Sequence, residues 1–193
     1  MKLSEWLTQL DPRARSWHPK VIQQIAKAQG VRTYLEVGIY RGETLRKLAR
    51  FCELVVGIDI DAKAISSIPS KKNIELFKGT VQEYAKHLGN NLPKFDLAFI
   101  DANHDMNFVV KDFDTTVPLM GNKSLILMHD TWPRNAAYSD PRFCGDAYRA
   151  VDVLRKKYID WNFVTIQKHP GLTLAQRVGV VPDWVTDTVI GSL

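Results

Sequence analysis

Short apolar runs alternate along most of the chain with longer segments in which apolar residues recur every three or four positions. Runs of the first kind lie at 33–37, 54–60, 74–79, 95–101 and 124–130. Apolar runs of this length are typical of strands that are buried on both faces of a parallel sheet. The pattern therefore predicts five such strands.

The second pattern predicts helices, because an apolar residue at every third or fourth position lines one side of a helix. The helices predicted in this way are 3–9, 19–29, 43–52, 106–119 and 146–158. Two further helix starts have capping signals. Asp61 is a good N-cap for a short helix, and Thr80 with Glu83 forms a T-x-x-E capping box.

The end of the chain has a different pattern. Two strand-like segments between 161 and 178 are separated by KHPG (168–171), which favours a hairpin. Strands that alternate with helices predict an α/β fold with a mostly parallel, doubly wound sheet, and the hairpin adds an antiparallel strand at one edge. Because no repeat or linker divides the chain, we expect a single domain over 1–193. Its expected parts are a helical cap at 1–30, a Rossmann-like core at 31–179 and a tail at 180–193.

Composition narrows the class of protein. Hydrophobic residues make up 45% and charged residues 24% of the chain, which is ordinary for a globular protein. No apolar run is long enough to cross a membrane, and the N-terminus lacks the features of a signal peptide. Cys52 and Cys144 match neither a disulfide framework nor a zinc site. We therefore expect free thiols and a cytoplasmic protein without a membrane partner.

The positive charge is concentrated near the N-terminus. The net charge is +5, and residues 11–50 contain nine Lys or Arg against three acids. This excess fits either a nucleic-acid surface or the solvated face of a helix. Aromatic residues do not alternate with the basic ones as they do in surfaces that stack on bases, so a nucleic-acid partner is not expected.

The first candidate site is the stretch YLEVGIYRGETL, where the first strand gives way to a helix. Gly38 and Gly42 allow a sharp turn and the close approach of a ligand. The dinucleotide fingerprint G-x-G-x-x-G is not met, because Tyr40 stands where it needs a glycine. Glu36 would repel a phosphate and suits a cationic ligand such as a sulfonium. The alternative is a simple turn beside a half-buried acid.

Asp59 ends the second strand. It lies near the spacing at which an acid reaches a ribose in nucleotide-binding units, and its two oxygens can accept ribose hydroxyls. The alternative, that it caps the next helix, fits Asp61 better. We therefore interpret Asp59 as a ligand-binding residue.

Four stretches together resemble the class I S-adenosylmethionine-dependent methyltransferases: YLEVGIYRGETL, VVGIDID, FDLAFIDANHDMNF and LILMHDTWP. The resemblance covers about residues 31–179. It implies a seven-stranded Rossmann-like sheet with one antiparallel strand from the hairpin, and S-adenosylmethionine as cofactor. It also places the methionine part at the glycine loop, the ribose at Asp59 and the adenine near Thr80, where many members have an acid. The cofactor-binding residues it implies are Glu36, Gly38, Tyr40, Arg41, Gly42, Asp59, Ile60, Thr80, Val81 and Asp101.

A second group of polar residues follows the fourth and fifth strands. Asp101 and Asp130 end neighbouring strands, and a divalent cation would neutralise two carboxylates that face one cleft. This part resembles the metal-dependent catechol-type and macrocin-type O-methyltransferases, which implies Asp101 and Asp130 as ligands and His104 as the general base. His129 stands where those families often have an acid, and as a ligand it would suit Mn²⁺, Fe²⁺ or Zn²⁺ better than Mg²⁺. The alternative is that Asp101 contacts only the cofactor and His129–Asp130 ends a strand.

Two segments are candidates for the acceptor side and for subunit contacts. Residues 131–148 form either an acceptor lid or a surface loop, and the tail at 180–193 would pack on the domain or join subunits of a homo-oligomer. The lid residues that could contact substrate are Trp132, Arg134, Tyr138 and Arg142.

The sequence thus predicts methyl transfer to the hydroxyl of a small molecule, a sugar or a phenol, assisted by Mg²⁺ or Mn²⁺. The catalytic residues would be His104 and Asp101, and the metal ligands Asp101, His129 and Asp130. Two alternatives are a cofactor-binding protein without catalysis and a nucleic-acid methyltransferase.

Overall fold

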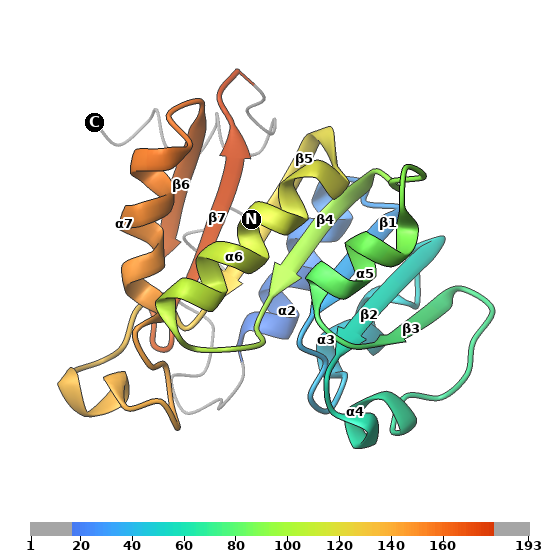
Figure 1. Cartoon of the computed structure of the whole chain (residues 1–193), viewed down its shortest axis with the longest axis horizontal. Helices are drawn as coiled ribbons and strands as arrows, with labels where there is room; N and C mark the ends of the chain where they lie inside the picture. The colour runs from blue at the N-terminus through green and yellow to red at the C-terminus, as the bar shows by residue number, and fades with distance from the viewer. Residues whose placement is uncertain (1–16, 180–193) are drawn as a thin grey trace.

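The computed structural model describes residues 17–179 as a seven-stranded sheet with helices on both faces (Figure 1). The strand order is β3-β2-β1-β4-β5-β7-β6. The strands are β1 (Thr33–Val37), β2 (Leu54–Asp59), β3 (Ile74–Lys78), β4 (Phe95–Ile100), β5 (Met120–His129), β6 (Trp161–Ile166) and β7 (Leu172–Arg177). Only β7 is antiparallel to its neighbours, β5 and β6, so the seven-stranded, mostly parallel fold predicted from the sequence is confirmed.

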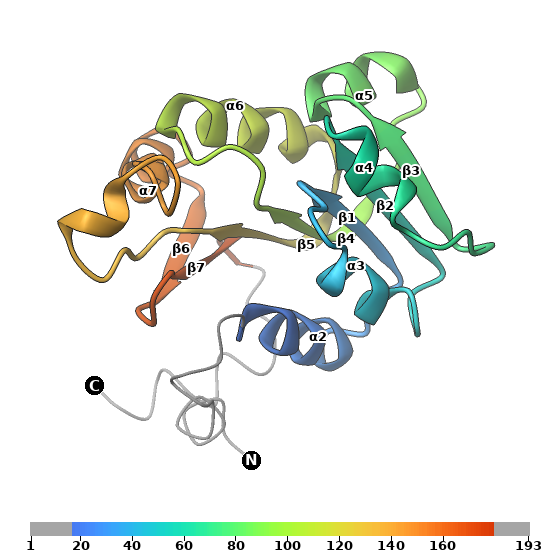
Figure 2. The same cartoon turned by 90° about the horizontal axis from the view of Figure 1, so that it is seen from below.

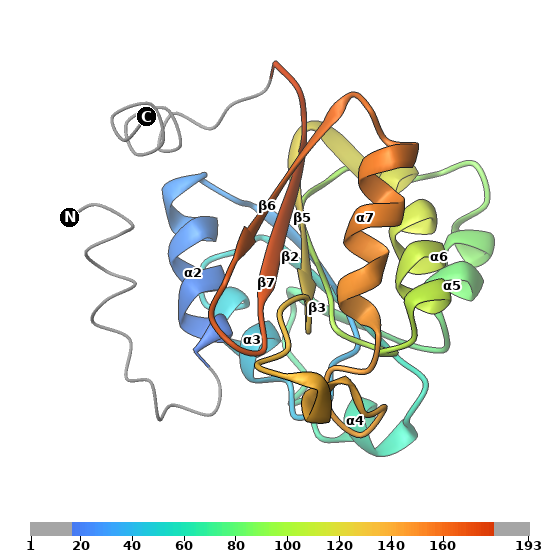
Figure 3. The same cartoon turned by 90° about the vertical axis from the view of Figure 1, so that its left-hand side faces the viewer.

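The helices lie in two layers, which Figures 2 and 3 show on either side of the sheet. Helices α5, α6 and α7 pack their apolar sides on one face and α2 and α3 pack on the other, whereas the short α4 lies beyond the carboxyl end of β2 (Figure 3). The helices are α2 (His18–Ala28), α3 (Glu43–Leu48), α4 (Ala62–Ser66), α5 (Val81–Leu88), α6 (Met106–Thr116) and α7 (Ala147–Lys157). Short 3₁₀ turns lie at Val117–Leu119 and Ala136–Ser139.

The predicted elements differ from the structure mainly at their ends. The helix predicted at 106–119 ends at Thr116, because Pro118 has no N–H with which to continue the α-helical bonds. The helix predicted at 43–52 ends at Leu48 and continues as turns. The hairpin does lie at one edge of the sheet, but the outermost strand is β6 and the antiparallel β7 lies one position inside. The predicted helix at 3–9 and the tail at 180–193 lie outside the described residues.

Two predicted caps are present. The Asp61 side chain accepts a hydrogen bond from the Lys63 N–H at the start of α4. At the start of α5, the Thr80 hydroxyl accepts from the Glu83 N–H, and the Glu83 carboxylate accepts from the Thr80 N–H. These local signals fix where the two helices begin, directly after the strands that end at the cleft described below.

The order of the strands reverses between β1 and β4, and here the backbone is tightly packed. Gly38, directly after β1, has a φ of +90°, and a Cβ built on it would lie 2.2 Å from the carbonyl oxygen of Asp101. Only glycine fits this position. The loop after β1 and the end of β4 are therefore held against each other at the point where open α/β sheets bind ligands.

Two further sequence predictions can be compared with the structure. Cys52 and Cys144 are both free, as predicted, and the structure places both in buried positions. Within residues 17–179, no helix combines the length and the apolar character needed to span a membrane.

Candidate active site

A cleft of about 1150 Å³ opens at the carboxyl ends of β1, β2 and β4. Most residues that the sequence predicted for cofactor binding line it. They are Gly38, Tyr40, Arg41, Asp59, Ile60, Thr80, Val81 and Asp101, and the predicted base His104 lines it as well. Glu36, Gly42, His129 and Asp130 do not line this cleft.

The glycine loop has an unusual backbone. Gly38, Tyr40 and Gly42 all have positive φ values, and Gly42 is the N-cap of α3 in the left-handed conformation. A positive φ is uncommon for a bulky residue such as Tyr40 and is found mostly where the surroundings enforce it. The Tyr40 ring remains exposed and stacks against the guanidinium of Arg41, so both side chains form an outer wall of the cleft.

Asp59 accepts the hydrogen bonds that hold this loop in its conformation. Its Oδ2 accepts hydrogen bonds from the N–H groups of Ile39 (2.8 Å) and Tyr40 (3.1 Å), and its Oδ1 accepts from that of Asp61 (2.8 Å). A carboxylate has about four acceptor positions, so one remains for a ligand. The sequence predicted the ribose contact but not this role in shaping the loop, which depends on a contact between two strand ends.

Glu36 lies inside the sheet rather than on the wall of the cleft. It is buried and accepts a hydrogen bond from the Tyr34 hydroxyl at 2.7 Å. Burial raises the pKa of Glu36 well above its usual value, and the nearby carboxylate of Asp101 acts in the same direction. Its predicted role, contact with a cationic ligand, stays a prediction, and any such contact would act from beneath the glycine loop.

Another part of the cleft is lined by residues of α5 and α6. Thr80 donates both its N–H and its hydroxyl hydrogen to Glu83 in the capping box, so neither hydrogen is free for a ligand, and its predicted contact with the cofactor stays a prediction. Gln82 and Asp112 line this part of the cleft and hydrogen-bond to each other at 2.9 Å. The sequence predicted neither residue for the site, because nothing in the spacing of residues 82 and 112 brings two helices together.

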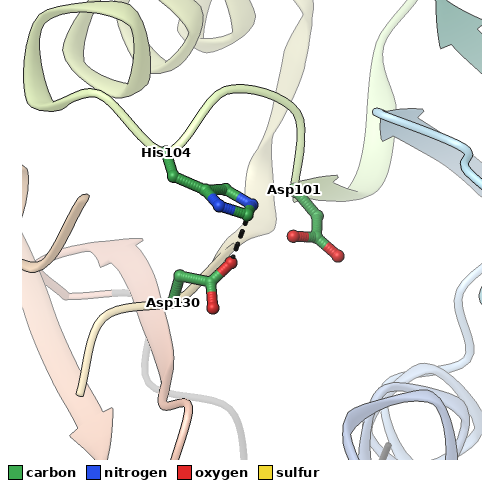
Figure 4. A group of neighbouring side chains, drawn as sticks. All are labelled: Asp101, His104 and Asp130. Carbon is green, nitrogen blue, oxygen red and sulfur yellow. Dashed lines mark ion pairs between the residues drawn. The ribbon is translucent and has the colours of Figure 1, made fainter. Parts of the chain in front are cut away.

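Asp101, His104 and Asp130 form the second group of polar residues (Figure 4). One ligand atom from each residue lies within 4.8 Å of the others. Asp101 directly follows β4, His104 lies in the loop after it and Asp130 directly follows β5, so the fold brings these three residues together. His104 Nε2 lies 3.0 Å from Asp130 Oδ2, and the His104 side chain is 31% exposed. Asp130 has a φ of +58°, a second strained backbone at the site.

His129 lies behind this group, between the two acids. Its Nδ1 is 3.1 Å from Asp101 Oδ1 and 3.2 Å from Asp130 Oδ2. Burial alone would lower the pKa of His129, but the two carboxylates outweigh it and raise this pKa to about 10. His129 is therefore an imidazolium at neutral pH. Its charge and hydrogen bond also overcome the effect of burial on Asp130 and lower the pKa of that carboxyl.

The N-terminal end of α2 covers His129 from the other side. The His18 ring lies 4.0 Å from the His129 ring, centroid to centroid, and Trp17 donates a hydrogen bond to the His169 carbonyl oxygen. Burial, together with the charge of His129, lowers the pKa of His18 to about 2, so His18 is neutral. A neutral ring can pack on an imidazolium without repelling it.

The segment 131–148 packs against the loop that contains His104. A Cβ built on Gly145 would lie 2.3 Å from the His104 carbonyl oxygen, and that oxygen accepts a hydrogen bond from the Asp146 N–H at 3.1 Å. Asp146 in turn accepts from the Met106 N–H at 2.7 Å. These contacts fix the backbone of His104 and hence the direction from which its ring enters the site.

The first half of the same segment is held by the hairpin turn. The Trp132 N–H donates to the Pro170 carbonyl oxygen at 2.7 Å, and the Arg134 N–H donates to His169 Nδ1 at 3.2 Å. The predicted lid residues Trp132, Arg134, Tyr138 and Arg142 do not line the cleft, whereas Pro141 does. Contact of these four with an acceptor stays a prediction.

Comparison with known families decides the class of protein. The family described as a methyltransferase domain matches residues 35–131, which includes the glycine loop, Asp59, Asp101 and Asp130. The chain belongs to this methyltransferase family. The prediction of a class I S-adenosylmethionine-dependent methyltransferase is thus confirmed. No curated protein sequence matches the chain significantly.

Solved structures share the fold of this methyltransferase at low sequence identity. An O-methyltransferase from Bacillus cereus, solved with SAH, is 19% identical with a TM-score of 0.71, covering 90% of this chain and 87% of the other. TomG from Streptomyces achromogenes, an O-methyltransferase of tomaymycin synthesis solved with SAM, is 19% identical with a TM-score of 0.70, covering 91% and 86%. The methyltransferase PaMTH1 from Podospora anserina, solved with SAH, is 18% identical with a TM-score of 0.67, covering 90% and 85%.

Proposed function

We propose that this methyltransferase transfers the methyl group of S-adenosylmethionine to a hydroxyl oxygen of a small molecule. The observation that carries the proposal is the pairing of His104 with Asp130 beside Asp101, at the end of a cleft shaped by the glycine loop. A hydroxyl needs a base to remove its proton, and this group supplies one next to the strand ends. The O-methyltransferases with a similar fold support the same acceptor class.

The cofactor would lie across the strand ends with its sulfonium near Gly38 and Asp101. Gly38 leaves bare backbone there, and the remaining acceptor position of Asp59 would take one ribose hydroxyl. Ile60 is 71% exposed beside the cleft and offers an apolar surface to the base. The enzyme then mainly aligns the methyl group with the acceptor oxygen, which is where much of the rate gain of such enzymes arises.

Asp130 fixes the form of His104 that acts as base. Because the carboxylate only accepts hydrogen bonds, the neutral His104 ring presents Nε2–H to Asp130 and keeps a lone pair on Nδ1. Nδ1 would take the proton of the acceptor hydroxyl as the oxygen attacks the methyl group. The imidazolium formed would be stabilised by Asp130, since its Nε2–H already points at that carboxylate.

The divalent cation predicted from the sequence belongs to the same proposal. Asp101 and Asp130 would be its ligands, with His104 the third group close to it, whereas His129 faces the acids from behind. The charges fit such an ion, because two carboxylates share only one imidazolium. When bound, an ion of this kind lowers the pKa of the acceptor hydroxyl.

Two measurements test the proposal. Titration calorimetry should show binding of S-adenosylhomocysteine by the wild-type protein, and lack of any binding at millimolar ligand would overturn the cofactor assignment. Methyl transfer from labelled S-adenosylmethionine is then measured with panels of phenols, sugars and structured RNA. Turnover of a phenol or sugar supports the proposal, whereas turnover of RNA alone, or none in any panel, would favour a nucleic-acid enzyme or a binding protein.

A further inference from the structure

Three consecutive residues, Cys144, Gly145 and Asp146, lie against both members of the His104–Asp130 pair. A Cβ built on Gly145 would lie 2.3 Å from the His104 carbonyl oxygen, which accepts a hydrogen bond from the Asp146 N–H at 3.1 Å. Cys144 is 1% exposed, and its thiol hydrogen-bonds to the Asp130 carboxylate. One short segment thus contacts the backbone of the proposed base and the side chain of its partner, which come from two different strand ends.

The Cys144 thiol is the donor in its contact with Asp130, because an ionised carboxylate only accepts hydrogen bonds. The backbone around the thiol is fixed by two further bonds. The Cys144 N–H donates to the Tyr138 carbonyl oxygen at 3.0 Å, and the Gly145 N–H donates to that of Asp140 at 3.1 Å. The sulfur therefore occupies a defined place beside the carboxylate.

Two histidines share one oxygen of Asp130, and they are held to different degrees. Asp130 Oδ2 lies 3.0 Å from His104 Nε2, the contact that Figure 4 shows, and 3.2 Å from His129 Nδ1. The His129 ring is buried and also contacts Asp101, whereas His104 lies on a loop and its side chain is 31% exposed. A carboxylate without a further partner could stay with His129 while the contact with His104 is lost. The thiol contacts the carboxylate from a third element, the segment before α7.

We propose that Cys144 is a positioning residue for the methyl-transfer reaction, and that its thiol holds the Asp130 carboxylate in the orientation that keeps the hydrogen bond with His104. The inference rests on the proposed function, in which His104 is the base. Cys144 does not line the cleft, so it acts through Asp130 and not on the cofactor or the acceptor. Gly145 and Asp146 hold the loop of His104 in the same segment, which thereby sets the distance between base and carboxylate.

The first measurement asks whether the thiol donates to Asp130, and it needs neither cofactor nor acceptor. In the full-length Cys52→Ala protein, Cys144 is the only cysteine, so its S–H stretch can be observed alone by infrared spectroscopy. A hydrogen bond to a charged acceptor is stronger than one to a neutral acceptor. The S–H frequency should therefore rise when Asp130→Asn is added. An identical band in the two proteins would overturn the inference.

The second measurement compares the turnover of Cys144→Ala, which lacks a donor, with that of Cys144→Ser, which keeps one. The acceptor is the phenol or sugar that the wild type methylates. In Cys144→Ala, kcat should fall by about tenfold to a hundredfold, the usual effect of a slightly misplaced catalytic group. The KM for S-adenosylmethionine should change by less than about twofold, because the lost contact is remote from the cofactor. Cys144→Ser should recover most of the loss in kcat.

Cys52→Ala is the matched control. Cys52 is also a buried free cysteine, and its thiol donates to the Val31 carbonyl oxygen at 3.7 Å, far along the chain from the site residues. This variant removes the same kind of side chain and the same kind of donor, so it should leave kcat and KM unchanged. A loss of kcat in Cys52→Ala as large as that in Cys144→Ala would overturn the specific role of Cys144.

The outcomes separate this inference from the proposed function. Equal losses of kcat in Cys144→Ala and Cys144→Ser would mean that Cys144 only fills space and would overturn the inference, whereas turnover by the wild type would still support the proposed function. Absence of turnover by the wild type with every acceptor would overturn the proposed function and the role of Cys144 with it. Should Cys144→Ala fail to fold, Cys144→Val fills the space without a donor and must show the same loss if the inference holds.

Discussion

His104 Nε2 and Asp130 Oδ2 lie 3.0 Å apart and join the loop after β4 to the end of β5. The same Asp130 oxygen lies 3.2 Å from His129 Nδ1, so one carboxylate serves two imidazoles. The two rings differ in exposure, since the His104 side chain is 31% exposed and that of His129 is 9% exposed. Of the two, His104 is the more open to a molecule in the cleft, whereas the buried His129 lies against Asp101 and Asp130, which raise its pKa to about 10.

Replacing His104 with Gln should abolish most turnover without weakening cofactor binding. General-base catalysis contributes about 10²- to 10⁴-fold, so we expect a loss of this size in kcat. The ring does not shape the glycine loop, so the Kd for S-adenosylhomocysteine should change by less than about twofold. His87→Gln, on the exposed last turn of α5, is the control and should leave both quantities unchanged. Full activity in His104→Gln would show that the base lies elsewhere.

Replacing His129 with Gln should reduce stability in a manner that depends on pH. The pKa of His129 is raised to about 10, from a usual value near 6.5, so the folded state holds a proton that the unfolded state releases between these values. The contribution of His129 to the free energy of unfolding is therefore complete below pH 6.5 and is lost as the pH rises through 10. The pKa of His18 is lowered from 6.5 to about 2, so this residue changes the free energy of unfolding only below about pH 6.5.

The measurement is urea denaturation of wild type and His129→Gln in EDTA at several pH values from 6.5 to 10.5. The difference in unfolding free energy should shrink steadily across this range. A difference that stays constant with pH would mean that His129 stabilises the protein by packing alone and is not an imidazolium in the folded state.

Much of the fold could be predicted because its signals are local. The strands at 33–37 and 95–101 are apolar runs, and the caps at Asp61 and Thr80 depend on residues within one helical turn. Asp101 and Asp130 could be brought together from the rule that parallel strands end at one edge of a sheet. This rule made it possible to predict a site once the strands had been predicted.

What could not be predicted depends on contacts between distant parts of the chain. His129 is next to Asp130 in the sequence, but the sequence does not show that the His129 ring contacts Asp101 on one side and packs against His18 on the other. The Gln82–Asp112 contact joins residues 30 positions apart on two helices. Glu36 was expected at the cleft. Its contact with Tyr34 is local, because residues two apart share one face of a strand, but the pattern of the strand does not tell where the wall of the cleft begins.

Gly38→Ala should damage the cleft more than the cost of a positive φ at an alanine would explain. A methyl group at this position would overlap the Asp101 carbonyl oxygen and push apart the ends of β1 and β4. We expect the Kd for S-adenosylhomocysteine to rise by more than tenfold and the melting temperature to fall.

Gly89→Ala is the control, because Gly89 also has a positive φ but a Cβ there meets nothing within 4 Å. The control should cost only about 1–3 kcal/mol of stability. Equal effects of the two substitutions on ligand binding would contradict this account of Gly38.

Addition of Mn²⁺ should raise the melting temperature of the wild-type protein if Asp101 and Asp130 bind a divalent cation. A ligand present at a hundred times its Kd adds about 2.7 kcal/mol, which corresponds to a rise of roughly 5–10 °C for a domain of this size. Asp101→Asn should remove most of the rise, whereas Asp96→Asn, at the opposite end of β4, should retain it.

EDTA should lower turnover in the wild type. Absence of any thermal shift together with full turnover in EDTA would mean that the His129 imidazolium alone balances the two carboxylates and that the reaction proceeds without a metal.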